Sequence, residues 1–348
     1  MYYKIIALHS IGKKIVLHYF DYHNHRNADL LKDYCVEICS YRRKNLFSSF
    51  SLSAPYIVSS RINTLLIKRL NVDTHPILLE GLHCSGILPF LNDSKRVVLR
   101  MHNDEVNYYK SLGKMENNLF RRFYFSAETT LITKYQKKLN TGIRAACLSE
   151  SDIEVLRTEY GFSDLHFIPC FIPWQAGNSL KGKGDYCLYH GNLSISENET
   201  AALWLLKNVF NKADVPFVIA GKGISQNLRM TAKKIKNCRL IDNPPVDELN
   251  SLIRDAHIHI LPSQNNTGVK LKLLHALCEG RFCITNNNGI KGSHIHSGVH
   301  IANTAEEYIV LLKQLFNQEF TEDDFMERTY IQTIYNNALN ARKLSALW

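Results

Sequence analysis

The alternation of short apolar runs with amphipathic stretches is the feature that most constrains how this chain can fold. The runs HPILLEGL (75–82), RVVLRMHN (96–103) and VPFVIAGKG (215–223) have the length and apolar content of buried parallel strands. Stretches such as ENETAALWLLKNVFNK (197–212) and VDELNSLIRDA (246–256) have helical patterning. Strands that alternate with helices predict parallel sheets joined by right-handed crossovers, which is an α/β fold.

The length of the chain indicates two domains. Its 348 residues exceed one ordinary domain and fit two of roughly 150 to 180 residues each. The Gly- and Lys-rich stretch QAGNSLKGKGD (175–185) has no apolar period and reads as a linker. We expect one α/β domain over 1–174, a second over 186–317, and a helical segment over 318–348 that packs back on the first. The two sheets would face each other across a cleft, with ligands at the carboxyl ends of the strands.

The charge of the chain points to an anionic partner. The 42 Lys and Arg residues against 32 Asp and Glu give a formal net charge of +10. That charge suits nucleic acid, nucleotide phosphates or an acidic membrane surface. Because no recognisable nucleic-acid-binding module accompanies it, we expect no nucleic-acid partner.

Cysteine usage and hydropathy indicate the compartment. The nine cysteines include no CxxC pair, which is typical of reduced, mostly buried thiols. No apolar run reaches the roughly 18 residues of a spanning helix, and the N-terminus lacks the layout of a signal peptide. We expect a cytoplasmic protein that can rest on the inner face of the cytoplasmic membrane.

Three glycine-containing turns follow strand-like runs in the second half of the chain. SQNNTG (263–268) leads into the helical stretch VKLKLLHALCEG (269–280), and the other two turns are HGN (190–192) and GKG (221–223). Where a strand is followed by the start of a helix, free backbone N–H groups and the positive end of the helix dipole favour phosphate. Three such turns at one sheet edge predict a phosphate-binding site.

Lys270 and Lys272, at the start of that helical stretch, allow two interpretations. Residues two apart on a helix do not share a face. In a first turn, however, both lysines can reach the N-terminal mouth of the helix and neutralise a diphosphate. Alternatively, both are solvated on an exposed flank above a core of Leu271, Leu274 and Leu277. Spacing alone leaves both interpretations open.

The order of the motifs resembles the donor half of family 4-type (group 1) glycosyltransferases of bacterial type, which have the GT-B fold. The resemblance rests on YHGNLSISENETAALWLL, FVIAGKG, HIHILPS and TGVKLKLLHALCEGRFCITNNNGIKG. In the first half, LLEGLHCSGIL, VVLRMHNDEVNYYKSL and AACLSESDIEVL are similar to the acceptor domain of the family. The likeness implies two Rossmann-like domains with parallel sheets facing across a cleft. It also implies transfer of a sugar from a UDP- or GDP-linked donor to an acceptor hydroxyl, usually with retention and without metal or cofactor.

The resemblance assigns roles to residues of the second half. Lys272 matches the donor-domain lysine of the family and Lys270 a basic residue two positions earlier, so both would stabilise the departing diphosphate. The further donor-binding candidates are Gly191, Asn192, Gly221, Lys222, Thr267, Gly268 and His275.

In the first half, the resemblance points to His102. It matches a histidine that ends an acceptor-domain strand and faces the sugar, so we expect it to be catalytic together with the two lysines; the alternative is a structural histidine. Glu80 and His83, at the neighbouring strand end, are candidates for acceptor contact.

The chain departs from the family pattern at three places. The family often has two glutamates eight positions apart around the donor helix, where this chain has Thr267 and His275. The second glutamate normally holds the nucleotide ribose, and an imidazole can also hydrogen-bond a hydroxyl. The basic pair of the family after the first donor-domain glycine is absent, and Asn192 and Glu199 stand near there. The stretch 1–20 reads as a first helix and second strand, so the first strand and its glycine loop are expected to be missing.

Two other groups of residues have no place in this scheme. SYRRKNLFSSF (40–50) and NNLFRRFYFS (117–126) are basic and aromatic, which fits an anionic membrane or a lipid-diphosphate acceptor; the alternative is a solvated face with core aromatics. The His-x-His pairs at 23/25, 257/259 and 294/296 could each share a strand face. No carboxylate cluster joins them, and we expect no metal site.

These observations predict a hexosyltransferase that moves a sugar from a nucleotide diphosphate-sugar to a glycan or lipid-linked acceptor in cell-surface polysaccharide synthesis. An inactive or truncated nucleotide-sugar-binding protein of the same fold is the main alternative, because of the lost glutamates and the missing strand. A nucleotide-sugar epimerase would need an acidic set that we do not find.

Overall fold

The computed structural model describes residues 1–21, 26–49, 51, 53–116, 118–139, 142–175 and 178–348. The chain divides into two compact units. Unit 1 comprises Met1–Pro173 and Tyr335–Trp348, and unit 2 comprises Trp174–Ile334. The boundary thus lies just before the expected linker, and the C-terminal residues that join unit 1 begin at Tyr335 rather than at 318.

Unit 1 has its strands in two parallel sheets, one of order β1-β2 and one of order β3-β4-β5-β6. Its elements are α1 (Tyr2–Ser10), β1 (Val16–Asp21), η1 (Arg26–Leu31), β2 (Glu37–Arg42), α2 (Leu46–Ser49), α3 (Tyr56–Ser59), α4 (Thr64–Leu70), β3 (Ile77–Glu80), η2 (Leu82–Phe90), β4 (Val97–Met101), α5 (Glu105–Met115), α6 (Leu119–Leu139), β5 (Arg144–Cys147), α7 (Glu150–Tyr160), β6 (Leu165–Phe167) and α16 (Asn337–Ser345).

The sheets of unit 1 are divided where a first strand would lie. In a doubly wound sheet of order 3-2-1-4-5-6, the first strand separates the second from the fourth. Here α1 precedes all strands, β1 and β2 pair with each other, and β3 begins the second sheet. Among the described residues, no strand pairs with both β1 and β3.

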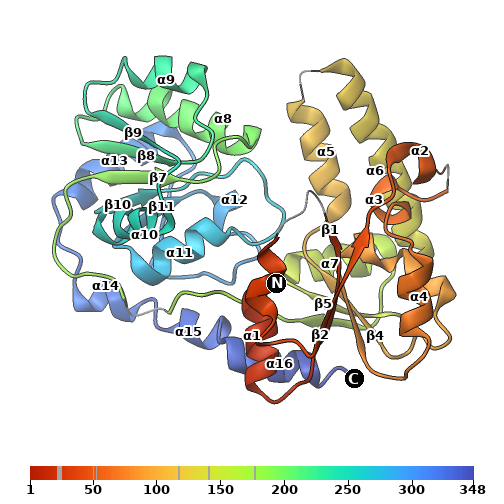
Figure 1. The fold of residues 1–348 in the computed structure, drawn as a ribbon. Helices are drawn as coiled ribbons and strands as arrows, with labels where there is room; N and C mark the ends of the chain where they lie inside the picture. The colour runs from red at the N-terminus through yellow and green to blue at the C-terminus, as the bar shows by residue number, and fades with distance from the viewer. Residues whose placement is uncertain (22–25, 50, 52, 117, 140–141, 176–177) are drawn as a thin grey trace. The chain divides into compact units, whose positions relative to one another are not determined.

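Unit 2 has one six-stranded parallel sheet of order β12-β11-β10-β7-β8-β9. This is the 3-2-1-4-5-6 pattern read from the other edge, and helices cover both sides of the sheet (Figure 1). Its elements are β7 (Cys187–His190), α8 (Ser196–Leu205), η3 (Leu206–Phe210), β8 (Phe217–Gly221), α9 (Gln226–Ala232), β9 (Cys238–Asp242), α10 (Val246–Asp255), β10 (Ile258–Ile260), α11 (Leu271–Glu279), β11 (Phe282–Thr285), α12 (Asn287–Ile290), β12 (His300–Ile301), α13 (Ala305–Phe316), α14 (Glu322–Met326) and α15 (Tyr330–Ile334).

Central strands of both units are buried along their whole length, which is why they read as continuous apolar runs. Every residue of β4 and of β8 is buried, as expected for parallel strands covered on both faces. The predicted α/β fold with parallel sheets is therefore confirmed. None of the described helices is both long and apolar enough to cross a membrane.

Candidate functional site

The turns after β7 and β8 touch each other at the carboxyl edge of the unit 2 sheet. Gly221 ends β8 with a φ of 156°, and a Cβ on it would lie 1.8 Å from the carbonyl oxygen of Gly191. The backbone N–H of Leu193 donates to the carbonyl oxygen of Lys222 at 2.7 Å. Because glycine has no Cβ, it allows this approach, and the two turns form one compact edge.

Lys272 is tied to this edge by neutral groups. Its Nζ donates to the Asn198 side-chain oxygen at 3.0 Å and to the Tyr189 hydroxyl at 3.2 Å, 4.8 Å from the centre of the tyrosine ring. Asn198 in turn donates to the backbone carbonyl of Asn192 at 2.9 Å. The ammonium group therefore faces the turn after β7, which the sequence analysis predicted as part of the phosphate site. Asn198 and Tyr189 orient the ammonium group, and neither of them was predicted from the sequence.

Lys272 forms no ion pair with any of the residues that the structure describes. Burial lowers the pKa of Lys272 to about 8, although the carboxylate of Glu197 opposes that shift. The Lys272 side chain is partly buried, and an ammonium group withdrawn from water without a direct carboxylate partner is unfavourable, so an anion that reaches Nζ would be bound favourably.

The loop before α11 is ordered by its own polar groups. Lys270 is the N-cap residue of α11, and its Nζ donates to the carbonyl oxygen of Thr267 at 2.7 Å. The Thr267 backbone N–H and hydroxyl donate to the side-chain oxygen of Asn265 at 2.8 and 2.9 Å. Gly268 has a φ of 64°, a left-handed conformation that favours glycine. Lys270 and Lys272 thus lie at the start of the helix, as expected.

Two side chains near this edge are more exposed than their proposed roles suggest. Leu271 is 49% exposed, so the idea that it belongs to the core is wrong; Leu274 and Leu277 are buried as expected. Leu271 is the first residue of α11, where the helix has just begun. Lys222 is also exposed, and only its backbone carbonyl joins the two turns.

His275 is buried between an indole ring and a carboxylate. Its ring stacks on that of Trp174, with centroids 4.1 Å apart and planes at 15°. Its Nε2 lies 3.0 Å from a carboxylate oxygen of Glu279, one turn further along α11. Burial lowers the pKa of His275, while Glu279 opposes the shift. Neither Trp174 nor Glu279 was predicted, although the four-residue spacing of His275 and Glu279 on a helix was a usable signal.

The His-x-His pair of β10 is buried in the sheet. His257, just before β10, and His259, within it, are both fully buried, and a ring nitrogen of His257 lies 3.0 Å from the carbonyl oxygen of Leu315. The pair at 23/25 lies outside the described residues. Within the described ranges, no group of three or more His, Cys, Asp or Glu side chains has the arrangement of a metal site.

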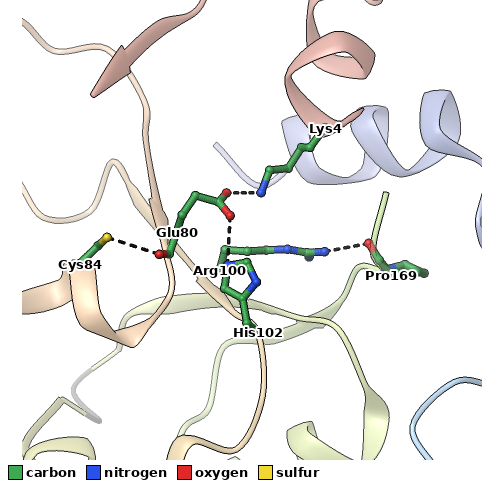
Figure 2. Close-up of polar contacts among 6 residues, drawn as sticks. All are labelled: Lys4, Glu80, Cys84, Arg100, His102 and Pro169. Carbon is green, nitrogen blue, oxygen red and sulfur yellow. Dashed lines mark hydrogen bonds and ion pairs between the residues drawn. The ribbon is translucent and has the colours of Figure 1, made fainter. Parts of the chain in front are cut away.

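In unit 1, Glu80 and His102 meet at the carboxyl edge of the β3–β6 sheet (Figure 2). Glu80 is the last residue of β3, and its neighbour across the parallel pair β3–β4 is Arg100, two residues before His102. The Nε2 atom of His102 lies 3.1 Å from one carboxylate oxygen of Glu80, and Lys4 of α1 forms an ion pair with the other. Sequence reasoning did not find Lys4, whose position within an apolar helix was the available signal.

The carboxyl group of Glu80 is held in its charged form. Burial alone would raise its pKa, but the Lys4 ammonium and the hydrogen bond and charge of His102 outweigh burial and bring the pKa below its usual range. Arg100 is fully buried and donates to the carbonyl oxygen of Pro169 at 2.7 Å (Figure 2). His102 remains partly exposed, with 39% of its side chain accessible. Its imidazole is therefore anchored on one side and open on the other.

His83 lies near this pair but in different surroundings. Its ring packs over Gly81, where a Cβ would lie 2.5 Å from the ring. Burial, reinforced by the charges of Arg61 and His102, lowers the pKa of His83 to about 4, so the ring is neutral near pH 7. The structure thus joins Glu80 to His102 and places His83 beside them.

The second unit matches a known family, and one curated relative resembles most of the chain. Residues 184–318 match the family described as Glycosyl transferases group 1. An uncharacterised 44.6 kDa protein in the cps region of Klebsiella pneumoniae is 29% identical over 286 residues, which cover 79% of this chain and 72% of that protein.

Several solved structures resemble this chain over most of its length. Sucrose-phosphate synthase of Thermosynechococcus elongatus gives a TM-score of 0.68 at 12% identity, covering 98% of this chain and 90% of that one. Anabaena HepE, solved in complex with UDP and glucose, gives 0.61 at 9% identity, covering 99% and 94%. TarM gives 0.50 at 13% identity over 75% of this chain, which spans little more than half (56%) of TarM. Residues 184–318 thus match the group 1 glycosyltransferases, and the architecture that the chain shares with these solved structures is the GT-B fold.

Proposed function

We propose that this protein transfers a sugar from a nucleotide diphosphate-sugar, bound by unit 2, to the hydroxyl of a glycan or lipid-linked acceptor. The observation that carries the proposal is Lys272. It is a partly buried ammonium held by Asn198 and Tyr189 beside the turn after β7, and it lacks a carboxylate partner at hydrogen-bonding distance among the described residues. A diphosphate would supply the missing negative charge. That charge grows as the sugar bond breaks, so the same contact would favour the transition state.

The roles of the other candidate residues follow from their positions. Lys270 would order the loop before α11 through Thr267. In unit 1, His102 would orient the sugar through its open side while Glu80 holds the ring. We further propose transfer with retention and without a metal ion, as the resemblance to the family implies.

The relatives support a uridine donor and a role in polysaccharide synthesis. HepE was solved with UDP and glucose, and a trehalose-phosphate synthase of similar fold is described as UDP-forming. The Klebsiella pneumoniae relative is encoded in a cps region, which suits a capsule-type polysaccharide. We therefore propose cell-surface polysaccharide synthesis as the process and UDP-sugars as the first donors to test.

A thermal-shift screen with the diphosphate sugars of uridine, guanosine and adenosine tests the donor assignment. A ligand that binds only the folded state raises its melting temperature. We expect one nucleotide class to do so, and Lys272→Ala to weaken that binding by about 1.5–3 kcal/mol, the worth of a charge-assisted hydrogen bond. Lys233→Ala, at an exposed position after α9, is the matched control. Unchanged nucleotide affinity in Lys272→Ala would rule out the diphosphate contact.

A further inference from the structure

The first turns of α6 expose large apolar side chains although they are helical. Leu119, Phe120 and Phe123 are 76%, 88% and 77% exposed, and Arg121 and Arg122 between them are exposed as well. We call Leu119–Phe123 the α6 tip. Contiguous apolar residues of this size on the surface commonly mark a binding surface.

The α6 tip points away from the core of unit 1. At about 100° per residue, Leu119, Phe120 and Phe123 fall within an arc of about 100° on one side of the helix. The buried side chains of α6, such as Glu128 and Ile132, lie on the opposite side. Packing against the β3–β6 sheet therefore leaves this apolar face uncovered within unit 1.

The neighbouring helix α5 brings further positive charge beside α6. α5 packs beside α6, where the rings of Tyr109 and Phe125 meet edge to face at 6.0 Å. Its lysines Lys110 and Lys114 are exposed. Arg121 remains 74% exposed although the carboxylate of Glu116 lies 3.9 Å away.

Arg43 and Lys44, from the other basic segment of the sequence, lie near the same helix. The backbone N–H of Tyr56 donates to both carboxylate oxygens of Glu128 on α6, at 3.0 Å each. The guanidinium of Arg43 lies over the ring of Tyr56, 4.4 Å from its centre. Lys44 beside it is exposed. Arg43 and Lys44 thus lie near the middle of α6, on the side that carries Glu128.

We propose that the α6 tip inserts into an anionic lipid surface, with its phenylalanines among the acyl chains and its arginines on the lipid phosphates. Helices with apolar and basic residues on separate faces bind membranes in this way. The apolar area also favours lipid over a protein partner. Three side chains of at most about 250 Å² each fall short of the roughly 800 Å² that each partner of a stable protein interface buries.

Co-sedimentation of the full-length protein with vesicles tests this proposal. One set of vesicles is phosphatidylcholine and the other is phosphatidylcholine mixed with phosphatidylglycerol. We expect binding to the mixed vesicles only, weakened by salt. Phe120→Ser combined with Phe123→Ser should lower the partition coefficient at least about tenfold, because two aromatic rings no longer leave water. Arg121→Gln combined with Arg122→Gln should remove the preference for anionic lipid.

Leu65→Ser is the control for exposed apolar residues, since Leu65 lies on α4 of the same unit and is 59% exposed; its vesicle binding should equal that of the wild type. Failure of the wild type to bind mixed vesicles, or equal binding by the phenylalanine variant, would overturn the proposal. A sedimentation-velocity experiment in which the wild type is a dimer and the phenylalanine variant is a monomer would also overturn it, because the α6 tip would then join two copies of the chain. The donor-binding thermal shift should be unchanged in every variant, which separates this result from that of the proposed function.

Discussion

Lys272 gives the donor site a pH dependence that can be measured at the residue scale. Its pKa is lowered to about 8 by burial, so the free protein loses the ammonium charge as pH rises above that value. We expect affinity for a nucleoside diphosphate to fall about tenfold between pH 7 and 9, because binding requires the charged form. Titration calorimetry across this range measures the effect.

Lys272→Arg is the matched control for that titration. A guanidinium stays protonated throughout the range, so the arginine variant should show a flat profile even if its affinity is lower overall. A flat profile in the wild type, or an equal decline in both proteins, would mean that another group binds the phosphates.

Sequence reasoning reached some site residues and missed others for a physical reason. Lys272 and His102 were singled out by the resemblance to the family, because the local pattern alone left a functional and a structural interpretation open for each. Lys4 and Trp174 act through contacts with Glu80 and His275 that lie far away in the sequence. No local pattern specifies such contacts, because tertiary packing creates them.

At the scale of elements, the contact between the turns after β7 and β8 depends more on Gly221 than on Gly191. We expect Gly221→Ala to destabilise the protein by about 1–3 kcal/mol or more, since its Cβ would overlap the carbonyl oxygen of Gly191 in a strained backbone conformation. Gly191→Ala is the matched comparison, because its Cβ would lie 3.5 Å from the Asn198 side chain, an ordinary contact. Urea unfolding should show a clearly larger loss for Gly221→Ala, and equal losses would contradict the junction.

The elements themselves were largely predictable. The strands were recognised because parallel strands buried on both faces are short apolar runs, as β4 and β8 show. The exposure of Leu271 was not predicted, and for the α6 tip the sequence left contact with a membrane and burial of core aromatics as open alternatives. Apolar residues near helix starts resemble core in sequence, and only the position of the helix on the sheet decides whether they are covered.

At the scale of the whole molecule, the chain returns to unit 1 at its C-terminus. Asn337, at the start of α16, exchanges two hydrogen bonds with the backbone of Ile172, at 3.1 and 2.7 Å. Leu344 is fully buried in unit 1. A C-terminal segment that packs on the first domain was expected, but its starting point was not, because α14 and α15 are continuous in sequence with it and yet belong to unit 2.

The most direct test is to measure the release of nucleoside diphosphate from a donor sugar. The measurement is made with and without an acceptor fraction prepared from cell-surface glycans and lipids. We predict release only when donor and acceptor are both present, and a fall of about 10²-fold or more in His102→Ala with donor binding retained. Tight donor binding without release in any acceptor fraction would contradict sugar transfer and identify a nucleotide-sugar-binding protein instead.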